Sequence, residues 1–91
     1  MHKVIFNVIF YLYPSGGTRG YARKTVELPF VPTTDTYLEC LAWKDARKPK
    51  SVSYNIDESY FYVDFGADNL DSESSIKTNK EMYASHEWEI S

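Results

Sequence analysis

The chain has 91 residues, a formal net charge of -3 and a single cysteine, Cys40. This length predicts one domain spanning residues 1–91. A single cysteine excludes an internal disulfide and therefore the disulfide-stapled secreted scaffolds, so we expect a reducing, cytoplasmic location. The apolar run near the N-terminus contains Asn7 and Tyr11, is too short to cross a membrane as a helix and precedes no small-residue cleavage site. We therefore expect no signal peptide and no membrane association.

Residues 3–13 carry the clearest pattern, which is a β-strand with two apolar faces. Successive side chains of a strand point to opposite sides of the sheet. One face holds Val4, Phe6, Val8, Phe10 and Leu12, and the other holds Ile5, Ile9, Tyr11 and Tyr13, interrupted only by Asn7. A strand of this kind is covered on both sides. We expect its second face to pack against segment 33–43, segment 72–84 or another subunit.

Residues 14–20 and 22–30 complete a predicted hairpin. The first range contains Pro14 and three glycines, which suit a reversal of the chain. The second range alternates apolar and polar residues, so we expect an antiparallel return strand with one apolar face. Pro29 and Pro32 end this strand or place it at a sheet edge.

Residues 33–43 fit two structures. In a helix, Thr36 and Glu39 would form a capping box, and Tyr37, Leu38 and Leu41 would share a face. In a strand, Leu38, Cys40 and Ala42 would alternate with Tyr37, Glu39, Leu41 and Trp43. The Thr, Tyr and Cys content lowers the helix propensity. We therefore predict a short strand here, followed by a charged loop over residues 44–50.

The C-terminal half predicts a second hairpin, a helix and a last strand. Residues 51–56 and 60–65 alternate strictly around a turn at 57–59, and we expect Gly66 to end the second strand and residues 67–75 to form a loop. A short helix over residues 72–84 would place Ile76 and Tyr83 on one face. Residues 86–90 alternate again, which predicts a short strand with Trp88 and Ile90 facing inward.

Together these elements predict a mainly β fold. We expect a small antiparallel barrel or curled sheet of five or six strands with one or two short helices. The alternative is an α+β fold in which an open antiparallel sheet carries the 72–84 helix on one face.

No motif in the sequence points to catalysis, a cofactor or a metal. The glycine-rich stretch 15–20 lacks the Gly-Lys-Ser or Gly-Lys-Thr ending of a phosphate-binding loop, and no predicted helix follows it. His2, His86 and Cys40 fit no zinc spacing, and no cysteine-protease signature surrounds Cys40. We therefore expect a non-catalytic protein without a cofactor or metal.

The eight tyrosines exceed what one small core needs. Exposed Tyr is enriched at protein interfaces, so we expect a small binding or adaptor protein that contacts another protein or forms a homodimer. The candidate interface residues are Ile9, Tyr11, Tyr13, Tyr60 and Tyr62. In the competing interpretation, a further layer of the protein's own structure covers these side chains.

The alternative function uses positive charge. Two predicted loops are basic, at residues 19–24 and 44–50, and each has an aromatic neighbour, Tyr21 or Trp43. If the two loops meet, they would bind single-stranded nucleic acid or another anionic ligand. The sequence pI of about 5.3 opposes this interpretation, because nucleic-acid-binding domains are usually basic. The basic side chains are Arg19, Arg23, Lys24, Lys44, Arg47, Lys48 and Lys50.

Overall fold

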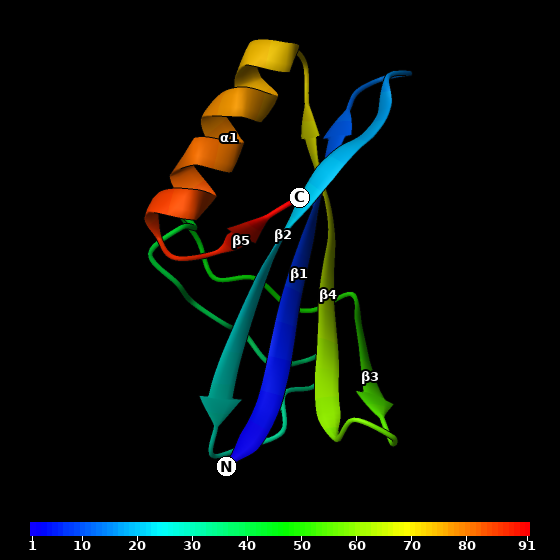
Figure 1. The fold of residues 1–91 in the computed structure, drawn as a ribbon, viewed down its shortest axis with the longest axis vertical. Helices are drawn as coiled ribbons and strands as arrows, with labels where there is room; N and C mark the ends of the chain where they lie inside the picture. Colours follow the sequence, from blue (N-terminus) through cyan, green and yellow to red (C-terminus); the bar gives the residue numbers. More distant parts are fainter.

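The chain folds into one five-stranded sheet with one helix. A computed structural model describes all residues from Met1 to Ser91 (Figure 1). Its elements are β1 His2–Leu12, β2 Gly17–Leu28, β3 Ser51–Asn55, β4 Tyr60–Leu70, α1 Glu73–Ser85 and β5 Glu89–Ile90. The sheet is open, with the strand order β3-β4-β1-β2-β5. The predicted mainly β fold is therefore confirmed, with five strands and one helix in a curled sheet that does not close into a barrel.

The two-faced strand β1 lies at the centre of the sheet. It pairs with β2 as an antiparallel hairpin and with β4 in parallel, and the other strand pairs are antiparallel. The sheet is therefore mostly antiparallel, as predicted, with one parallel pair. This pair arises because segment 29–50 returns the chain before β3 begins, so that β3 runs in the same direction as β2. Figure 1 shows β1, β2 and β4 side by side along the long axis of the molecule, with α1 beside one end.

The first hairpin is confirmed, but its return strand begins earlier than predicted. β2 starts at Gly17 rather than Ala22, and only residues 13–16 form the turn. Gly17 and Gly20 have positive φ angles of 79° and 134°. Glycine adopts such angles with little steric cost, so these residues continue the strand through an irregular pairing near Phe10 instead of widening the loop.

The helix α1 and segment 29–50 both pack on the same side of the sheet, which we call the inner face. It carries the alternate side chains of β1 from Val4 to Leu12, and the fully buried ring of Phe10 meets Tyr83 of α1 at a centroid distance of 5.5 Å. Trp43 of segment 29–50 packs against Phe65 of β4 at 4.7 Å. The buried core residues are Val4, Val8, Phe10, Ala22, Val63, Phe65, Ile76, Tyr83 and Trp88.

The predicted helix is confirmed as α1, with Ile76 and Tyr83 as its buried residues. Ser72 caps its first turn, because the Ser72 hydroxyl accepts a hydrogen bond from the Ser75 backbone N–H at 3.1 Å. At the other end, the Trp88 N–H donates to the Tyr83 carbonyl at 3.1 Å while Glu87 has φ of 67°. This Schellman arrangement turns the chain back into β5, so the last strand, predicted over residues 86–90, is confirmed only at residues 89–90 because residues 86–88 form the turn. No helix in the protein combines the length and apolar character needed to cross a membrane.

The predicted strand within residues 33–43 is wrong. The structure has only an isolated bridge between Leu38 and Arg47 there. Hydroxyl groups compete with regular backbone pairing, and the Thr36 hydroxyl accepts a hydrogen bond from the Thr33 N–H at 3.0 Å. The apolar residues of the segment lie against the inner face rather than in the sheet. They are Leu38, Cys40, Ala42 and Trp43. The predicted loop at 44–50 is confirmed.

Gly66 does not end its strand, because β4 continues to Leu70. Residues 67–70, predicted as loop, therefore belong to the sheet. Asn7 pairs with Asp64 and Ile9 with Ala67, so Phe65 and Gly66 together oppose Val8 in a bulge. Gly66 has φ of 81°. Such a bulge moves each following side chain to the opposite face, which places Asp68 and Leu70 on the inner face.

Candidate functional site

The second face of the sheet, which we call the outer face, carries polar and aromatic side chains that contact one another. Asn7 lies at its centre and is only 4% exposed. The Asn7 Nδ2 donates to Asp64 Oδ1 of β4 at 3.1 Å, and its Oδ1 accepts from Arg23 Nε of β2 at 3.1 Å. One amide therefore links both neighbouring strands and leaves neither end of its side chain unpaired. A buried polar group with this pairing does not carry the usual cost of desolvation.

Arg23 is held between two tyrosines on this face. Its guanidinium carbon lies 4.3 Å from the ring centroid of Tyr21 and 5.8 Å from that of Tyr62. Both distances suit cation–π attraction. Arg23 is exposed, while the two tyrosines are half-buried. Because the Nε bonds Asn7 and the guanidinium lies near both rings, the motion of this side chain is restrained while its remaining N–H groups are open to solvent. We call Asn7, Tyr21, Arg23, Tyr62 and Asp64 the arginine cluster.

Four of the five predicted interface residues lie on the outer face around this cluster. Ile9 and Tyr11 of β1 and Tyr60 and Tyr62 of β4 are half-buried. Tyr60 lies 5.8 Å below the Lys3 ammonium, measured to the ring centroid. Tyr13 lies just beyond the end of β1 in the hairpin turn and is 59% exposed. The helix and segment 29–50 cover the inner face, so the competing interpretation of a second layer over these tyrosines gains no support.

Sequence reasoning missed the centre of this surface. Asn7 was visible only as an interruption in an apolar face, and Arg23 was assigned to the basic loops. The informative signal was the alternation of β2, which puts Arg23 on the side opposite Val26 and Leu28. Combined with a central Asn on the neighbouring strand, that alternation could have placed a buried amide beside an arginine.

The predicted basic residues do not gather into one site. Arg23 faces outward, whereas the adjacent Lys24 faces inward and donates to the His86 carbonyl at 3.1 Å. Arg19 forms a salt bridge with Glu73 at 3.0 Å, and Arg47 forms one with Asp68 at 2.8 Å.

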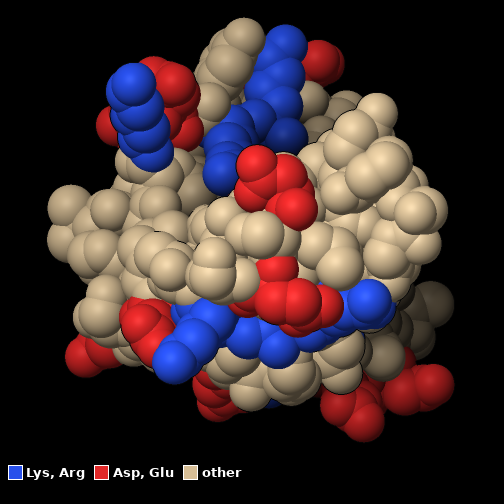
Figure 2. All heavy atoms as spheres, turned by 90° about the horizontal axis from the view of Figure 1, so that it is seen from above, with Lys and Arg blue, Asp and Glu red and all other residues tan.

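The other predicted cations lie in the 44–50 loop. The Lys48 ammonium lies 4.9 Å from the ring centroid of Tyr37, Lys44 is exposed and Lys50 is beside Gly66. Figure 2, which views one end of the molecule, shows basic side chains next to acidic ones rather than a continuous positive patch.

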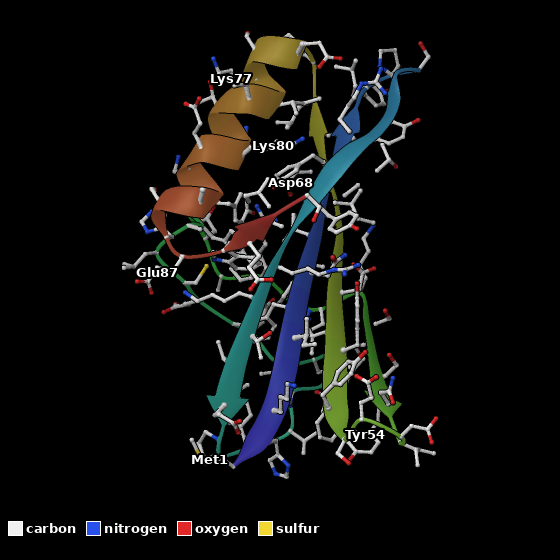
Figure 3. The ribbon with its side chains drawn as sticks, viewed as in Figure 1. Met1, Tyr54, Asp68, Lys77, Lys80 and Glu87 are labelled. Atoms are coloured by element: carbon white, nitrogen blue, oxygen red, sulfur yellow. The ribbon has the colours of Figure 1, made fainter.

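A second polar cluster links α1, β4 and segment 29–50, which meet on the inner side of the sheet. The Trp43 Nε1 donates to the Tyr83 hydroxyl at 2.9 Å, and that hydroxyl donates to Asp68 Oδ2 at 3.2 Å. The other carboxylate oxygen, Asp68 Oδ1, accepts from Arg47. Burial, followed by the Asp68 charge, raises the pKa of Tyr83 to about 12. The phenol therefore stays protonated at neutral pH and links α1 to β4 and to segment 29–50. Figure 3 labels Asp68, the residue that β4 contributes to this cluster.

Neither cluster resembles a metal centre, and no group of three His, Cys, Asp or Glu side chains is placed to hold a metal ion. Comparison of the chain with protein-family models, curated proteins and solved structures finds no match.

Proposed function

We propose that the protein is a small non-catalytic binding or adaptor protein that acts through protein contacts made by the outer face of its sheet. The observation that carries this proposal is the exposed Arg23 held between Tyr21 and Tyr62. Arg and Tyr are, with Trp, the side chains that most often dominate binding energy at interfaces. The contacts of Arg23 with Asn7, Tyr21 and Tyr62 restrain its side chain before any partner arrives.

The surroundings of Arg23 support the same proposal. Next to the arginine cluster, β1 adds apolar surface from the half-buried side chains of Ile5, Ile9 and Tyr11. No helix packs over this side of the sheet. Interface centres combine such apolar and aromatic area with a polar rim. The proposed partner is a second copy of the chain or another protein. The single free thiol, Cys40, fits a reducing cytoplasm as the place of action.

We assign the protein no catalytic role and give less weight to binding of nucleic acid. The titratable group with a clearly shifted pKa is Tyr83, which is a hydrogen-bonded link within the inner layer. The two most strongly paired basic side chains, Arg19 and Arg47, are already engaged by carboxylates. An anionic polymer would have to displace these partners or bind cations on opposite faces.

Site-specific photo-crosslinking tests the proposal. A photoreactive phenylalanine analogue at Tyr62 is expected to give a defined adduct in cells, either a covalent dimer or a single heterologous protein. The same analogue at Lys77, which points away from the sheet on α1 (Figure 3), is expected to give none. Arg23→Ala is expected to weaken the association at least about tenfold, measured by sedimentation or by titration of the purified partner.

Two results would contradict the proposal. One is a monomer at every concentration together with no adduct at position 62. The other is an adduct that survives Arg23→Ala and forms equally at Lys77, because an association of that kind does not use the outer face.

A further inference from the structure

Two adjoining hollows lie on the inner side of the sheet, away from the arginine cluster. One has a volume of about 220 Å³ and the other about 280 Å³, and both are lined by Lys24, Cys40 and Trp88. They run between β2, the 38–43 segment and the C-terminal end of α1. Typical small-molecule sites occupy about 300–1,000 Å³. Each hollow is slightly smaller than this, and the two share the lining residues Lys24, Cys40 and Trp88.

The smaller hollow is apolar. A cavity of about 150 Å³ lined by apolar side chains is enough to hold a benzene molecule, so this hollow has room for a ring or a short alkyl chain. Both tryptophans of the protein contribute to it. Its apolar lining is Phe6, Val26, Leu28, Leu38, Cys40, Trp43 and Trp88.

A half-buried cation stands where the two hollows meet. The Lys24 ammonium donates one hydrogen bond to the His86 carbonyl at the end of α1, where the helix dipole favours positive charge. Lys24 forms no salt bridge with any carboxylate. An ammonium has three donors, so two of its N–H groups remain for a ligand. Glu39 and Glu87 also line the hollows, but both are exposed and their charges are screened by water.

We propose that this hollow binds a small amphipathic carboxylate, with its apolar part between Trp43 and Val26 and its carboxylate on Lys24. The apolar lining selects for hydrocarbon, and burial of the alkyl chain supplies most of the affinity. The unpaired ammonium selects for negative charge through a charge-assisted hydrogen bond. This inference does not depend on the proposed protein interface, because Lys24 and Arg23 face opposite sides of the sheet.

The two tryptophans provide the test, since both line the apolar hollow and the chain has no others. Octanoate, octanol and octylammonium share one chain and differ in charge. We expect octanoate to change the tryptophan fluorescence and to shift the two indole N–H signals in NMR spectra, saturably. We expect octanol to bind at least about tenfold more weakly and octylammonium more weakly still.

Two variants test whether the Lys24 ammonium is the group that binds the carboxylate. Lys24→Met keeps the length of the side chain and removes the ammonium, so octanoate binding is expected to fall to the level of octanol while octanol binding stays unchanged. Lys77→Met makes the same substitution on the solvent side of α1 (Figure 3) and is expected to change nothing. Equal binding of octanoate and octylammonium to the unmodified protein would overturn the proposal, and so would the absence of any saturable signal. This comparison decides the matter even if Lys24→Met does not fold.

Discussion

Asp68 lies on the inner face because Gly66, two residues earlier, occupies a bulge with a left-handed backbone. Without the extra residue, Asp68 would point to the outer face with Tyr62 and Asp64. The bulge therefore brings this carboxylate within hydrogen-bond distance of both Arg47 and Tyr83. By placing Asp68 on the inner face, Gly66 thus allows β4 to bond both α1 and segment 29–50.

Gly66→Ala is expected to destabilise the protein by about 1–2 kcal/mol from the left-handed backbone alone. An added Cβ would also meet the Lys50 side chain at 2.6 Å, which must then move. Gly17→Ala is the matched control, because Gly17 has a similar φ of 79° and its nearest neighbour to an added Cβ is 3.9 Å away. Urea unfolding measures the free energy of unfolding of both variants, and we expect Gly66→Ala to lower it more than Gly17→Ala. Equal or smaller loss there would show that the bulge tolerates a side chain.

Glu87→Gly is expected to stabilise the protein by about 0.5–1 kcal/mol, the usual range for improving a helix end. Glu87 adopts φ of 67° at the end of α1, and glycine is favoured at this position of the Schellman motif. The substitution also removes a negative charge from the negative end of the helix dipole. Ala84→Gly, within the last turn of α1, introduces the same residue and is expected to cost about 1 kcal/mol. The midpoint temperature of thermal unfolding should therefore rise for Glu87→Gly and fall for Ala84→Gly.

The stability of the protein is expected to fall between pH 10 and about pH 12. The pKa of Tyr83 is about 12 in the folded protein and 10.0 without the fold. In this interval the unfolded chain has lost the phenol proton and the folded chain retains it, so rising pH favours unfolding. The stability that Tyr83 contributes through its proton is fully present below pH 10, and above that pH it decreases by at most about 1.4 kcal/mol per pH unit. Tyr83→Phe should remove this component from the pH dependence of urea unfolding, while lowering stability at neutral pH.

The two tryptophans are expected to respond differently to replacement by Phe. Trp43 Nε1 donates to the Tyr83 hydroxyl, whereas the buried Trp88 Nε1 has no hydrogen-bond partner. Trp43→Phe therefore leaves the Tyr83 hydroxyl without its donor, while Trp88→Phe removes an unpaired N–H. We expect Trp43→Phe to lose about 1 kcal/mol through this hydrogen bond, in addition to the packing of a half-buried ring, whereas Trp88→Phe loses only the packing of a buried ring. Chemical unfolding in a Tyr83→Phe background checks this: the cost of Trp43→Phe should shrink by about 1 kcal/mol while that of Trp88→Phe stays the same, and an unchanged cost of Trp43→Phe would contradict the prediction.

The sequence predicted the elements whose information is local. Strict alternation in residues 51–56 and 60–65 is enough to identify a hairpin, and the seven-residue spacing of Ile76 and Tyr83 is enough to place a helix. Each pattern reflects a periodicity that is set by neighbouring residues along the chain. The two apolar faces of β1 predicted cover on both sides, but α1 and segment 29–50 both lie over the same face, and Ile5, Ile9 and Tyr11 on the other face are only half-buried.

The elements that were missed depend on long-range packing. Leu38 and Trp43 belong to an irregular segment laid over the sheet, and apolar residues show the same alternation whether they join a sheet or cover it. Gly66 carries no local sign of whether it ends a strand or bulges it. At the outer face, alternation alone places Tyr60 and Tyr62 on one side of β4, but the hydrogen bond of Arg23 depends on Asn7 lying directly opposite it on β1.

The central position of β1 also joins contacts at very different separations along the chain. Its pairing with β2 closes a short loop, whereas its contact with β4 joins Asn7 to Asp64 across a separation of 57 residues. Contacts this distant along the chain form slowly, because the entropy of a large loop is lost before they are gained. The arginine cluster spans both pairings. A partly folded chain can therefore hold the hairpin and still lack the complete arginine cluster, so that the proposed recognition through this face would distinguish fully folded molecules from partly folded ones.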